Sequence, residues 1–266
     1  MLSTAKHLQN YAIHATDGII GHVRDVYFDD HSWIVRYLVV ETNGGQRNRK
    51  VLISPVSVTR VDAMERVLTL SITRQQLEDS PGIDTDKPIS RGHERSVLGY
   101  YGYPYYWDAA SLRGTGSFSS VLLNMSERGM ATAPHGDADI KRAQGIAEIG
   151  LGSDADIHLH SCREVAGYRI EAADGHIGQV KDFLLQESTW AIRYLVINTS
   201  KWWSDHDVLV AVRWIHSVRW MDHTVTVALT CLAVKDSPAY DPERELDREQ
   251  EAALFEHYGK AAYWKD

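Results

Sequence analysis

The amino-acid sequence contains an internal repeat, and this repeat constrains the fold more than any other feature. Adding 157 to a residue number in the first half gives its counterpart in the second half without a gap, as when Asp17-Gly18 matches Asp174-Gly175. About a third of the aligned positions are identical over about 95 residues, which chance does not explain. Because each copy is too long to be one unit of a solenoid, we expect two domains, each with its own hydrophobic core.

The matching ends at Trp107 in the first copy and at Trp264 in the second, which sets the expected domain boundaries. We predict a first domain at residues 1–107, a linker at 108–156 and a second domain at 157–266. The linker is rich in Gly, Ala, Ser and Asp. This composition is typical of a flexible connection, in which we expect one weak helix at 138–149.

Each copy has the sequence pattern of short β-strands separated by tight turns. In the first copy, Asp17-Gly18 and residues 29–32 form the expected turns between the first three strands. Both faces of the third strand, at 33–42, are mostly apolar, which favours a closed or nearly closed barrel over a sheet with one solvated face. The full set of predicted strands is 11–14, 21–28, 33–42, 50–53, 58–62 and 67–72.

Short helices are predicted after the strands of each copy. Thr73, followed three residues later by Gln76, has the spacing of a capping box and predicts one such helix. A last helix is predicted at 91–100, with a counterpart at 248–258. The predicted N-caps and stops of these last helices are Ser90, Asp247, Gly102 and Gly259.

Composition disfavours several classes of protein. The formal net charge of -8 argues against nucleic acid and against anionic membrane surfaces as partners, since both require clustered Lys and Arg. No stretch approaches the roughly 18 apolar residues of a membrane span, and no apolar secretory signal begins the sequence, so we expect a cytoplasmic location. The two cysteines, Cys162 and Cys231, both lie in the second copy and are predicted to be reduced thiols.

Several motifs together resemble the PRC-barrel family. They are ATDGIIGHVRDVYFDDHSWIVRYLVVET, its copy AADGHIGQVKDFLLQESTWAIRYLVINT, the later DSP segment and the closing YYGYPYYW. The resemblance covers residues 6–107 and 160–264 and implies a small six-stranded β-barrel. The predicted fold is therefore mainly β: two tandem six-stranded PRC-type barrels, each with short C-terminal helices, joined by a flexible linker.

The resemblance implies docking rather than catalysis. Related barrels occur in the H subunit of the photosynthetic reaction centre and in the ribosome maturation factor of the small subunit. The sequence differs from both, because no membrane helix and no separate N-terminal domain precede the first barrel, and because it is acidic. It resembles most the bacterial group of tandem PRC-barrel proteins, whose function the fold does not settle.

We therefore predict a non-enzymatic adaptor that binds an unidentified protein partner and needs no cofactor. Two alternatives stay open. One is a metal-dependent or small-molecule enzyme that uses the cleft between the barrels and the histidines near the linker. The other is a ribosome-associated or RNA-associated docking factor, which would need a basic face that the composition does not promise.

Charged residues that recur in both copies are the first candidate site. Asp25 and Arg36 recur as Asp182 and Arg193, on strands expected to be neighbours. They could bind an anion or a partner's side chain, but we interpret them as structural cross-strand ion pairs. Beyond these positions, we expect no polar cluster that repeats in both copies.

Two histidines near the linker are a candidate metal site. His158 and His160 would lie on one face of an extended segment, with Asp154 and Asp156 just before them. We favour the interpretation as a solvated polar stretch. None of the common catalytic or phosphate-binding motifs occurs, so we predict no catalytic, metal-binding or cofactor-binding residue.

Aromatic residues form the candidate interaction surface, because Trp and Tyr are frequent anchors of protein interfaces. Two alternatives stay open. Either these side chains simply cover the barrel ends, or the aromatic tails at 100–107 and 258–264 pack as latches on their own or a sister barrel. A latch that crosses between chains would make a homodimer. The residues are Trp202, Trp203, Tyr103, Tyr105, Tyr106, Trp107, Tyr263 and Trp264.

Overall fold

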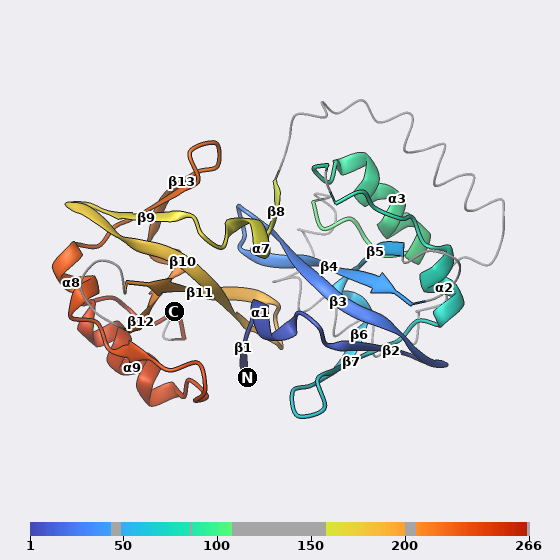
Figure 1. Cartoon of the computed structure of the whole chain (residues 1–266), viewed down its shortest axis with the longest axis horizontal. Coiled ribbons are helices and arrows are strands. Elements are labelled where there is room, and N and C mark those ends of the chain that lie inside the picture. The colour runs from blue at the N-terminus through green and yellow to red at the C-terminus, as the bar shows by residue number, and fades with distance from the viewer. Residues whose placement is uncertain (44–48, 86, 108–157, 200–205, 265–266) are drawn as a thin grey trace. The chain divides into compact units, whose positions relative to one another are not determined.

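The computed structural model describes residues 1–43, 49–85, 87–107, 158–199 and 206–264 (Figure 1). Within these residues the chain is mainly β, with short helices after the strands. None of the described helices has the length and apolar character needed to cross a bilayer. Several predictions fall outside the described residues, namely the linker at 108–156 with its weak helix, Asp154, Asp156, Trp202 and Trp203.

The chain divides into two compact units. The N-terminal unit consists of His7–His160 and Ser188–Trp190, and the C-terminal unit of Met1–Lys6, Ser161–Glu187 and Ala191–Asp266. The units follow the two sequence repeats apart from short segments, which differ from the predicted boundaries. Both cysteines are free thiols, as predicted.

Six strands form the sheet of the N-terminal unit. They are β2 (Ala12–Ala15), β3 (Gly18–Asp29), β4 (Ile34–Thr42), β5 (Arg49–Ile53), β6 (Val58–Asp62) and β7 (Val67–Leu70). Their order is β6-β7-β2-β3-β4-β5, with only β2 and β7 parallel among these ladders. The 3-10 helix η1 (Pro55–Ser57) connects β5 to β6, but no ladder joins these two described strands. The sheet is therefore open, and the predicted closed six-stranded barrel is not what the ladders form.

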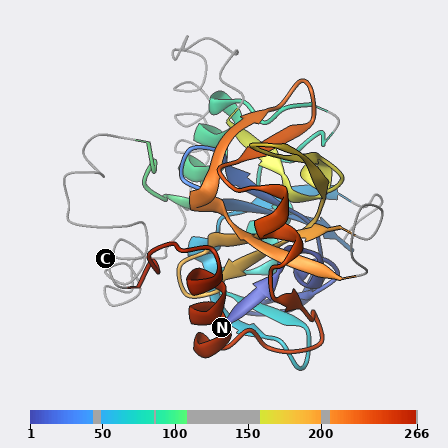
Figure 2. The ribbon, with the colours of Figure 1, turned by 90° about the vertical axis from the view of Figure 1, so that its left-hand side faces the viewer.

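The C-terminal unit repeats this arrangement. Its order is β13-β14-β9-β10-β11-β12, with β9 and β14 parallel, and the short β15 adds to β12. Figure 2 views this unit from the side of its helices. The elements are β9 (Arg169–Ala172), β10 (Gly175–Gln186), β11 (Ala191–Asn198), β12 (Asp207–Ala211), η2 (Val212–Trp214), β13 (Ile215–Arg219), β14 (Thr224–Val227), α8 (Cys231–Lys235), β15 (Ala239–Tyr240) and α9 (Arg248–His257).

Repeated glycines allow the closest approach between strands. A Cβ atom at Gly21 would lie 2.1 Å from the carbonyl oxygen of Glu41 on β4. A Cβ atom at Gly178 would lie 2.3 Å from the carbonyl oxygen of Asn198 on β11. Only glycine fits at these two positions, which explains why both copies of the sequence have it.

The predicted helix caps of the N-terminal unit are confirmed. Thr73 and Gln76 form the capping box of α2 (Arg74–Asp79). Ser90 caps α3 (Arg91–Tyr101), which ends at Gly102 in the left-handed conformation with φ 69°. In the C-terminal unit, Asp247 caps α9, also through a capping box. These local signals depend only on neighbouring residues, so the sequence specifies them well.

The hydrophobic core of the N-terminal unit surrounds β4. Residues 35–40 are all buried, so both faces of this strand are covered, as its apolar pattern predicted. Leu38 and Val97 of α3 are fully buried. Each such side chain contributes about 1.5–3 kcal/mol relative to an exposed one. This core holds α3 in place, and α3 carries the first residues of the candidate site.

Each unit also contains a short strand from the other repeat. Strand β1 (Leu2–Thr4) pairs with β10 in the C-terminal unit, and β8 (Leu159–Ser161) pairs with β3. These backbone ladders tie each segment to the opposite repeat, so the two compact units differ at their ends from the predicted domains. Short helices, α1 (Ala5–Leu8) and α7 (Cys162–Val165), follow the two exchanged strands.

Candidate functional site

The last helix of each repeat presents an arginine and a glutamate on one face. Ser90 starts α3 so that Arg91 and Glu94, three residues apart, lie side by side. Their counterparts on α9 are Arg248 and Glu251. The two glutamates are 0% and 3% exposed, which is rare for a carboxylate unless other groups satisfy it. The neighbours of each glutamate therefore define a site.

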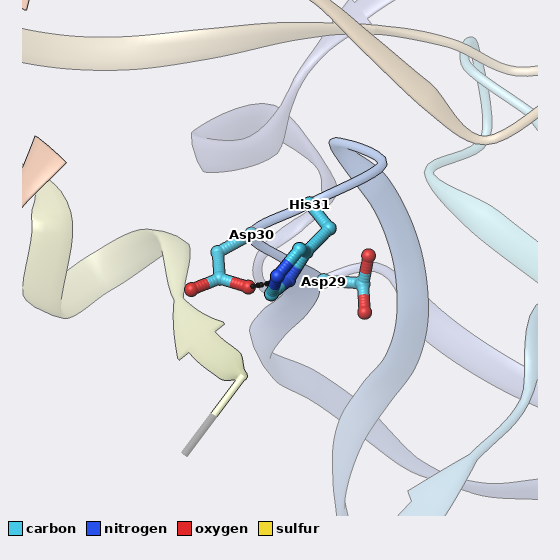
Figure 3. Close-up of side chains that lie close together, drawn as sticks. All are labelled: Asp29, Asp30 and His31. Atoms are coloured by element: carbon cyan, nitrogen blue, oxygen red, sulfur yellow. Dashed lines mark hydrogen bonds and ion pairs between the residues drawn. The ribbon is translucent and has the colours of Figure 1, made fainter. Parts of the chain in front are cut away.

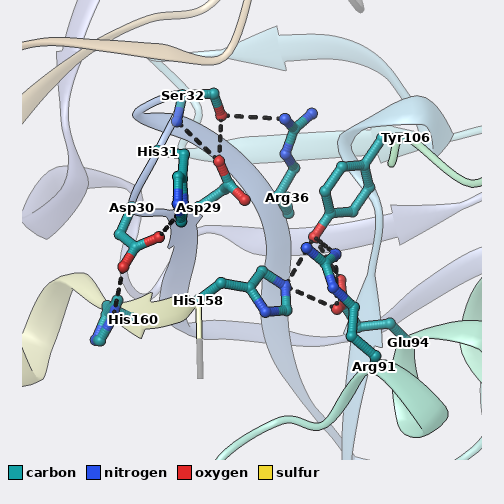
Figure 4. Close-up of polar contacts among 10 residues, drawn as sticks. All are labelled: Asp29, Asp30, His31, Ser32, Arg36, Arg91, Glu94, Tyr106, His158 and His160. Atoms are coloured by element: carbon teal, nitrogen blue, oxygen red, sulfur yellow. Dashed lines mark hydrogen bonds and ion pairs between the residues drawn. The ribbon is translucent and has the colours of Figure 1, made fainter. Parts of the chain in front are cut away.

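In the N-terminal unit, Glu94 is the centre of a buried polar cluster (Figure 4). The hydroxyl of Tyr106 donates to its Oε2 atom over 2.6 Å. Its Oε1 atom lies 2.9 Å from Nε2 of His158 and 3.2 Å from Nη1 of Arg91. The guanidinium of Arg36 covers the ring of Tyr106 at 3.9 Å from its centroid. Groups from β4, from α3, from the residues that follow α3 and from the residue before β8 thus meet at the carboxylate of Glu94.

The C-terminal unit has an equivalent cluster around Glu251. The hydroxyls of Tyr194 and Tyr263 donate to its Oε1 atom over 2.7 Å and 3.0 Å. Nη1 of Arg248 lies 2.9 Å from its Oε2 atom. The guanidinium of Arg193 lies 4.6 Å from the centroid of the Tyr263 ring. Arg, Glu, Tyr and Arg therefore recur at equivalent positions in both units.

This repetition overturns one expectation from the sequence, which predicted no repeated polar cluster. The signal was present, because Arg91 and Glu94 recur at the same spacing as Arg248 and Glu251. It was missed because the residues that meet at each carboxylate are far apart in the sequence, and helix surfaces often carry such a pair.

Burial controls the ionisation of these groups. Burial raises the pKa of Tyr106 well above its usual value, and the adjacent Glu94 raises it further. Burial likewise raises the pKa of Tyr194, whose hydroxyl donates to Glu251. Burial lowers the pKa of Arg36, an effect that Tyr106 partly offsets. The tyrosines are therefore held as protonated donors, a state suited to fixing a carboxylate rather than to transferring a proton near neutral pH.

The two clusters hold the aromatic tail of each repeat against its own unit. The residues concerned are 103–107 after α3 and 263–264 after α9. Tyr103 is 7% exposed and shares a 2.9 Å hydrogen bond with Ser57. Trp107 lies under Arg91, whose guanidinium carbon is 4.5 Å from the ring centroid, and Tyr105 stacks on Trp107. In the other unit, Tyr263 and Trp264 pack on Phe255 of α9. Of the two interpretations of the tails, the structure thus favours the latch on the same unit.

The first recurring charged pair, Asp25 and Arg36, lies on β3 and β4. Asp25 lies opposite Val39, with a register shift between Val23 and Asp25. Arg36 donates to Oγ of Ser32 over 3.0 Å. The predicted cross-strand ion pair between Asp25 and Arg36 stays a prediction.

The second recurring charged pair, Asp182 and Arg193, lies on β10 and β11. Asp182 lies opposite Val196, and its carboxylate accepts the backbone N–H of Lys6 over 3.1 Å. Arg193 donates to Oε1 of Gln186 over 2.6 Å and 2.9 Å. Asp182 therefore anchors the segment after β1 rather than the neighbouring strand.

The turn after β3 contains three possible metal ligands, Asp29, Asp30 and His31, whose donor atoms lie within 4.8 Å of one another (Figure 3). Nδ1 of His31 lies 2.7 Å from Asp30, while Asp29 accepts the backbone N–H of Ser32. Nε2 of His160 lies 3.4 Å from Asp30 on its other side. Burial alone would raise the pKa of Asp30, but the hydrogen bonds from His160 and His31 outweigh it and lower the pKa. The two histidines thus lie apart, with His160 at this turn and His158 at Glu94. Both are buried, so the prediction of a solvated polar stretch is wrong for them.

A cavity of about 180 Å³ lies in the C-terminal unit. Leu209 and Leu254 form part of its apolar wall, and Tyr240, Asp241 and Arg244 contribute polar groups. Its volume is below the roughly 300–1,000 Å³ of typical small-molecule sites. No candidate residue from the sequence lines it, so it adds little to the case for a small-molecule enzyme.

Comparison with known proteins concerns the first repeat. No curated protein matches the chain. The family model of the PRC-barrel domain matches residues 8–77. This range includes all six strands of the N-terminal sheet, from β2 to β7. The sheet of the N-terminal unit is therefore the part of the chain that matches the PRC-barrel domain.

Proposed function

We propose that the chain is a non-enzymatic assembly module, an adaptor whose two β-sheet units bind a protein partner. The observation that supports this most is a pair of exposed methionines at equivalent hairpins. Met64 lies between β6 and β7, and Met221 lies between β13 and β14. Each is 95% exposed. We call these two hairpins, at 58–70 and 215–227, the paired hairpins.

The paired hairpins also have free strand edges. β6 and β13 are the terminal strands in the order of their sheets. Their middle residues, including Thr59 and His216, are exposed. A terminal strand presents unpaired backbone N–H and C=O groups, to which a partner can add a strand. An exposed edge next to an exposed apolar tip therefore suits a protein ligand.

Methionine at the hairpin tip fits this role. Its unbranched, polarizable side chain adapts to partners of different shape, and methionine is frequent on binding surfaces for that reason. By contrast, the polar side chains that meet at Glu94 and Glu251 satisfy one another. Among the exposed large apolar side chains of the described residues, Met64 and Met221 are repeat counterparts, which favours binding over chemistry.

Affinity capture from host cell extract tests this function. The wild-type chain is compared with a Met64→Lys, Met221→Lys double variant and with Leu232→Lys as the control. Leu232 is 66% exposed but lies on α8, outside the paired hairpins. We expect the double variant to lose partners that both other proteins retain. Equal capture by all three proteins would contradict the assignment of the paired hairpins.

A metal-dependent function is the second candidate, favoured only by the grouping of Asp29, Asp30 and His31. In the described structure these donors already hydrogen-bond to one another and to Ser32. A metal would have to replace those bonds. Elemental analysis of protein purified without chelator decides the question, because one metal ion per chain that is lost in an Asp30→Asn variant would support this candidate.

A further inference from the structure

The exchanged strands are related by the same offset as the rest of the repeat. β1 at Leu2–Thr4 and β8 at Leu159–Ser161 differ by 157 residues. β1 pairs with β10, and β8 pairs with β3, so each unit takes its strand from the other copy of the sequence (Figure 1). In each unit, this strand position is therefore filled by residues of the other repeat.

The hydrogen bonds at the two exchanged strands correspond in detail. The backbone N–H of Glu187 donates to the carbonyl of Met1 over 3.2 Å. The backbone N–H of Asp30 donates to the carbonyl of His158 over 3.0 Å. Residues 1 and 158, and residues 30 and 187, are repeat counterparts. The same backbone hydrogen bond has thus formed at both sites although the side chains differ. This indicates that the backbone, and not particular side chains, determines how the strand pairs.

Side chains reinforce the ladder in the C-terminal unit. Ser3 donates its hydroxyl to the carboxylate of Glu187. The backbone N–H of Lys6 donates to Oδ1 of Asp182 over 3.1 Å. Ala5, which follows the strand, is 1% exposed. Residues 1–6 are therefore bound at several points by β10.

β10 accepts a further strand because it extends beyond the end of its neighbour β9. β9 pairs only with residues 175–179 of β10, whereas β11 pairs with 179–186. Beyond Gln179, the edge of β10 on the β9 side is covered by β1 at residues 184–186. Backbone N–H and C=O groups left buried and unpaired there would destabilise the fold. The edge consequently favours a strand from any source that fits.

We propose that this edge of β10 is a strand-accepting site that a second copy of the chain fills with its own Leu2–Thr4, so that two chains exchange their N-terminal strands. The bonds formed are identical whichever copy supplies the strand, so only chain connectivity separates the two forms. The inference goes beyond the proposed function, since it concerns self-assembly at a surface other than the paired hairpins. Either can fail while the other holds.

The strand of the same chain competes for the site. A tethered segment has an effective concentration on the order of millimolar, so exchange between chains grows as the protein concentration approaches that range. The ladder has only three residue pairs, Leu2 with Gln186, Ser3 with Leu185 and Thr4 with Leu184. So short a ladder can open and re-form while the remaining ladders of both sheets stay intact, which permits exchange.

Cysteine pairing between two full-length proteins tests the proposal. Both proteins carry Cys162→Ser and Cys231→Ser. One also carries Thr4→Cys, and the other carries Leu184→Cys and an affinity tag. Because Glu187 bonds to Met1, the alternation of antiparallel pairs makes Thr4 and Leu184 a non-hydrogen-bonded pair, whose Cβ atoms are closest. After mixing and oxidation, we expect a tagged, disulfide-linked heterodimer whose yield rises with protein concentration.

A matched control replaces Thr4→Cys by Thr16→Cys, the same change at an exposed turn residue outside every strand. We expect the Thr4 heterodimer to exceed the Thr16 heterodimer by on the order of tenfold near millimolar concentration, where exchange competes with the tethered strand. Equal yields at every concentration would overturn the proposal. Should Leu184→Cys fail to fold, Leu2→Cys with Gln186→Cys, which are also paired across the ladder, gives the same decision by the same comparison.

Discussion

The hydroxyl of Tyr106 donates to the Oε2 atom of Glu94 over 2.6 Å, and this bond joins the tail of the first repeat to helix α3. The tail is therefore part of the folded unit. Tyr263 and Glu251 form the equivalent bond in the second repeat, over 3.0 Å. A residue pair kept in both copies for folding explains why the aromatic tails recur.

Removing this bond should destabilise the N-terminal unit. Tyr106→Phe takes one donor from a buried carboxylate, and we expect the free energy of unfolding to fall by about 1–3 kcal/mol. Urea denaturation measures the change. Thr16→Ala, at an exposed turn, is the control and should change the free energy by less than about 0.5 kcal/mol. A Tyr106→Phe protein as stable as the control would show that the tail is not a latch.

Asp30 should stabilise the fold only above acidic pH. Its pKa in the folded protein lies below the usual 3.8, because hydrogen bonds from His160 and His31 outweigh the effect of burial. The ionised carboxylate therefore stabilises the folded state above that value, and the stabilisation disappears as pH falls through the folded pKa. Asp30→Asn should be less stable than wild type near neutral pH and converge with it in acid. Unfolding curves recorded across this pH range test the prediction, and a constant difference would refute it.

Asp182 should show the opposite pH dependence. Burial raises its pKa despite hydrogen bonds from Phe183, Lys6 and Thr4. The folded state therefore binds the proton more tightly than the unfolded state does, and stability is lost as pH rises through the folded pKa. Asp182→Asn keeps an oxygen acceptor and removes the buried charge, so we expect it to be more stable than wild type at neutral pH. The gain should vanish on acidification, and a variant that is less stable at neutral pH would contradict this reasoning.

Two glycine-to-alanine substitutions distinguish a position where only glycine fits from one where glycine merely lowers helix propensity. Gly21→Ala would place a Cβ atom 2.1 Å from the carbonyl oxygen of Glu41, and we expect it to prevent stable pairing of β3 with β4. Gly92→Ala lies inside α3, where the nearest contact is Oγ of Ser90 at 3.7 Å. It should stabilise the protein by up to about 1 kcal/mol, because alanine favours helix. Thermal unfolding of the two variants should therefore shift in opposite directions, and shifts of the same sign would show that the close approach at Gly21 is not limiting.

The sequence predicted those features that depend on neighbouring residues. The capping box at Thr73 and Gln76, the cap at Ser90 and the left-handed stop at Gly102 are all as expected. Each is a local pattern with one dominant structural outcome. The topology also repeats between the units, as the offset of 157 implied.

Features that depend on pairing across the chain were not predictable. Bulges interrupt the ladder of β3 with β4, and Asp25 lies opposite Val39. The exchange of β1 was not visible either, because a three-residue strand has no periodic pattern and its ladder partner, β10, is more than 170 residues away. The meeting of Glu94 with His158 follows from the corresponding pairing of β8 with β3, and thus neither could be read from the sequence.

Photo-crosslinking tests the central claim, that the paired hairpins bind a protein partner, most directly. The chain has five methionines, at positions 1, 64, 125, 130 and 221, and all can be replaced in host cells by a photoreactive analogue. After irradiation, mass spectrometry identifies the methionines to which other proteins are attached. The account predicts attachment at Met64 and Met221, and its loss when both are replaced by Leu. Partner peptides attached only at the other three positions would contradict it.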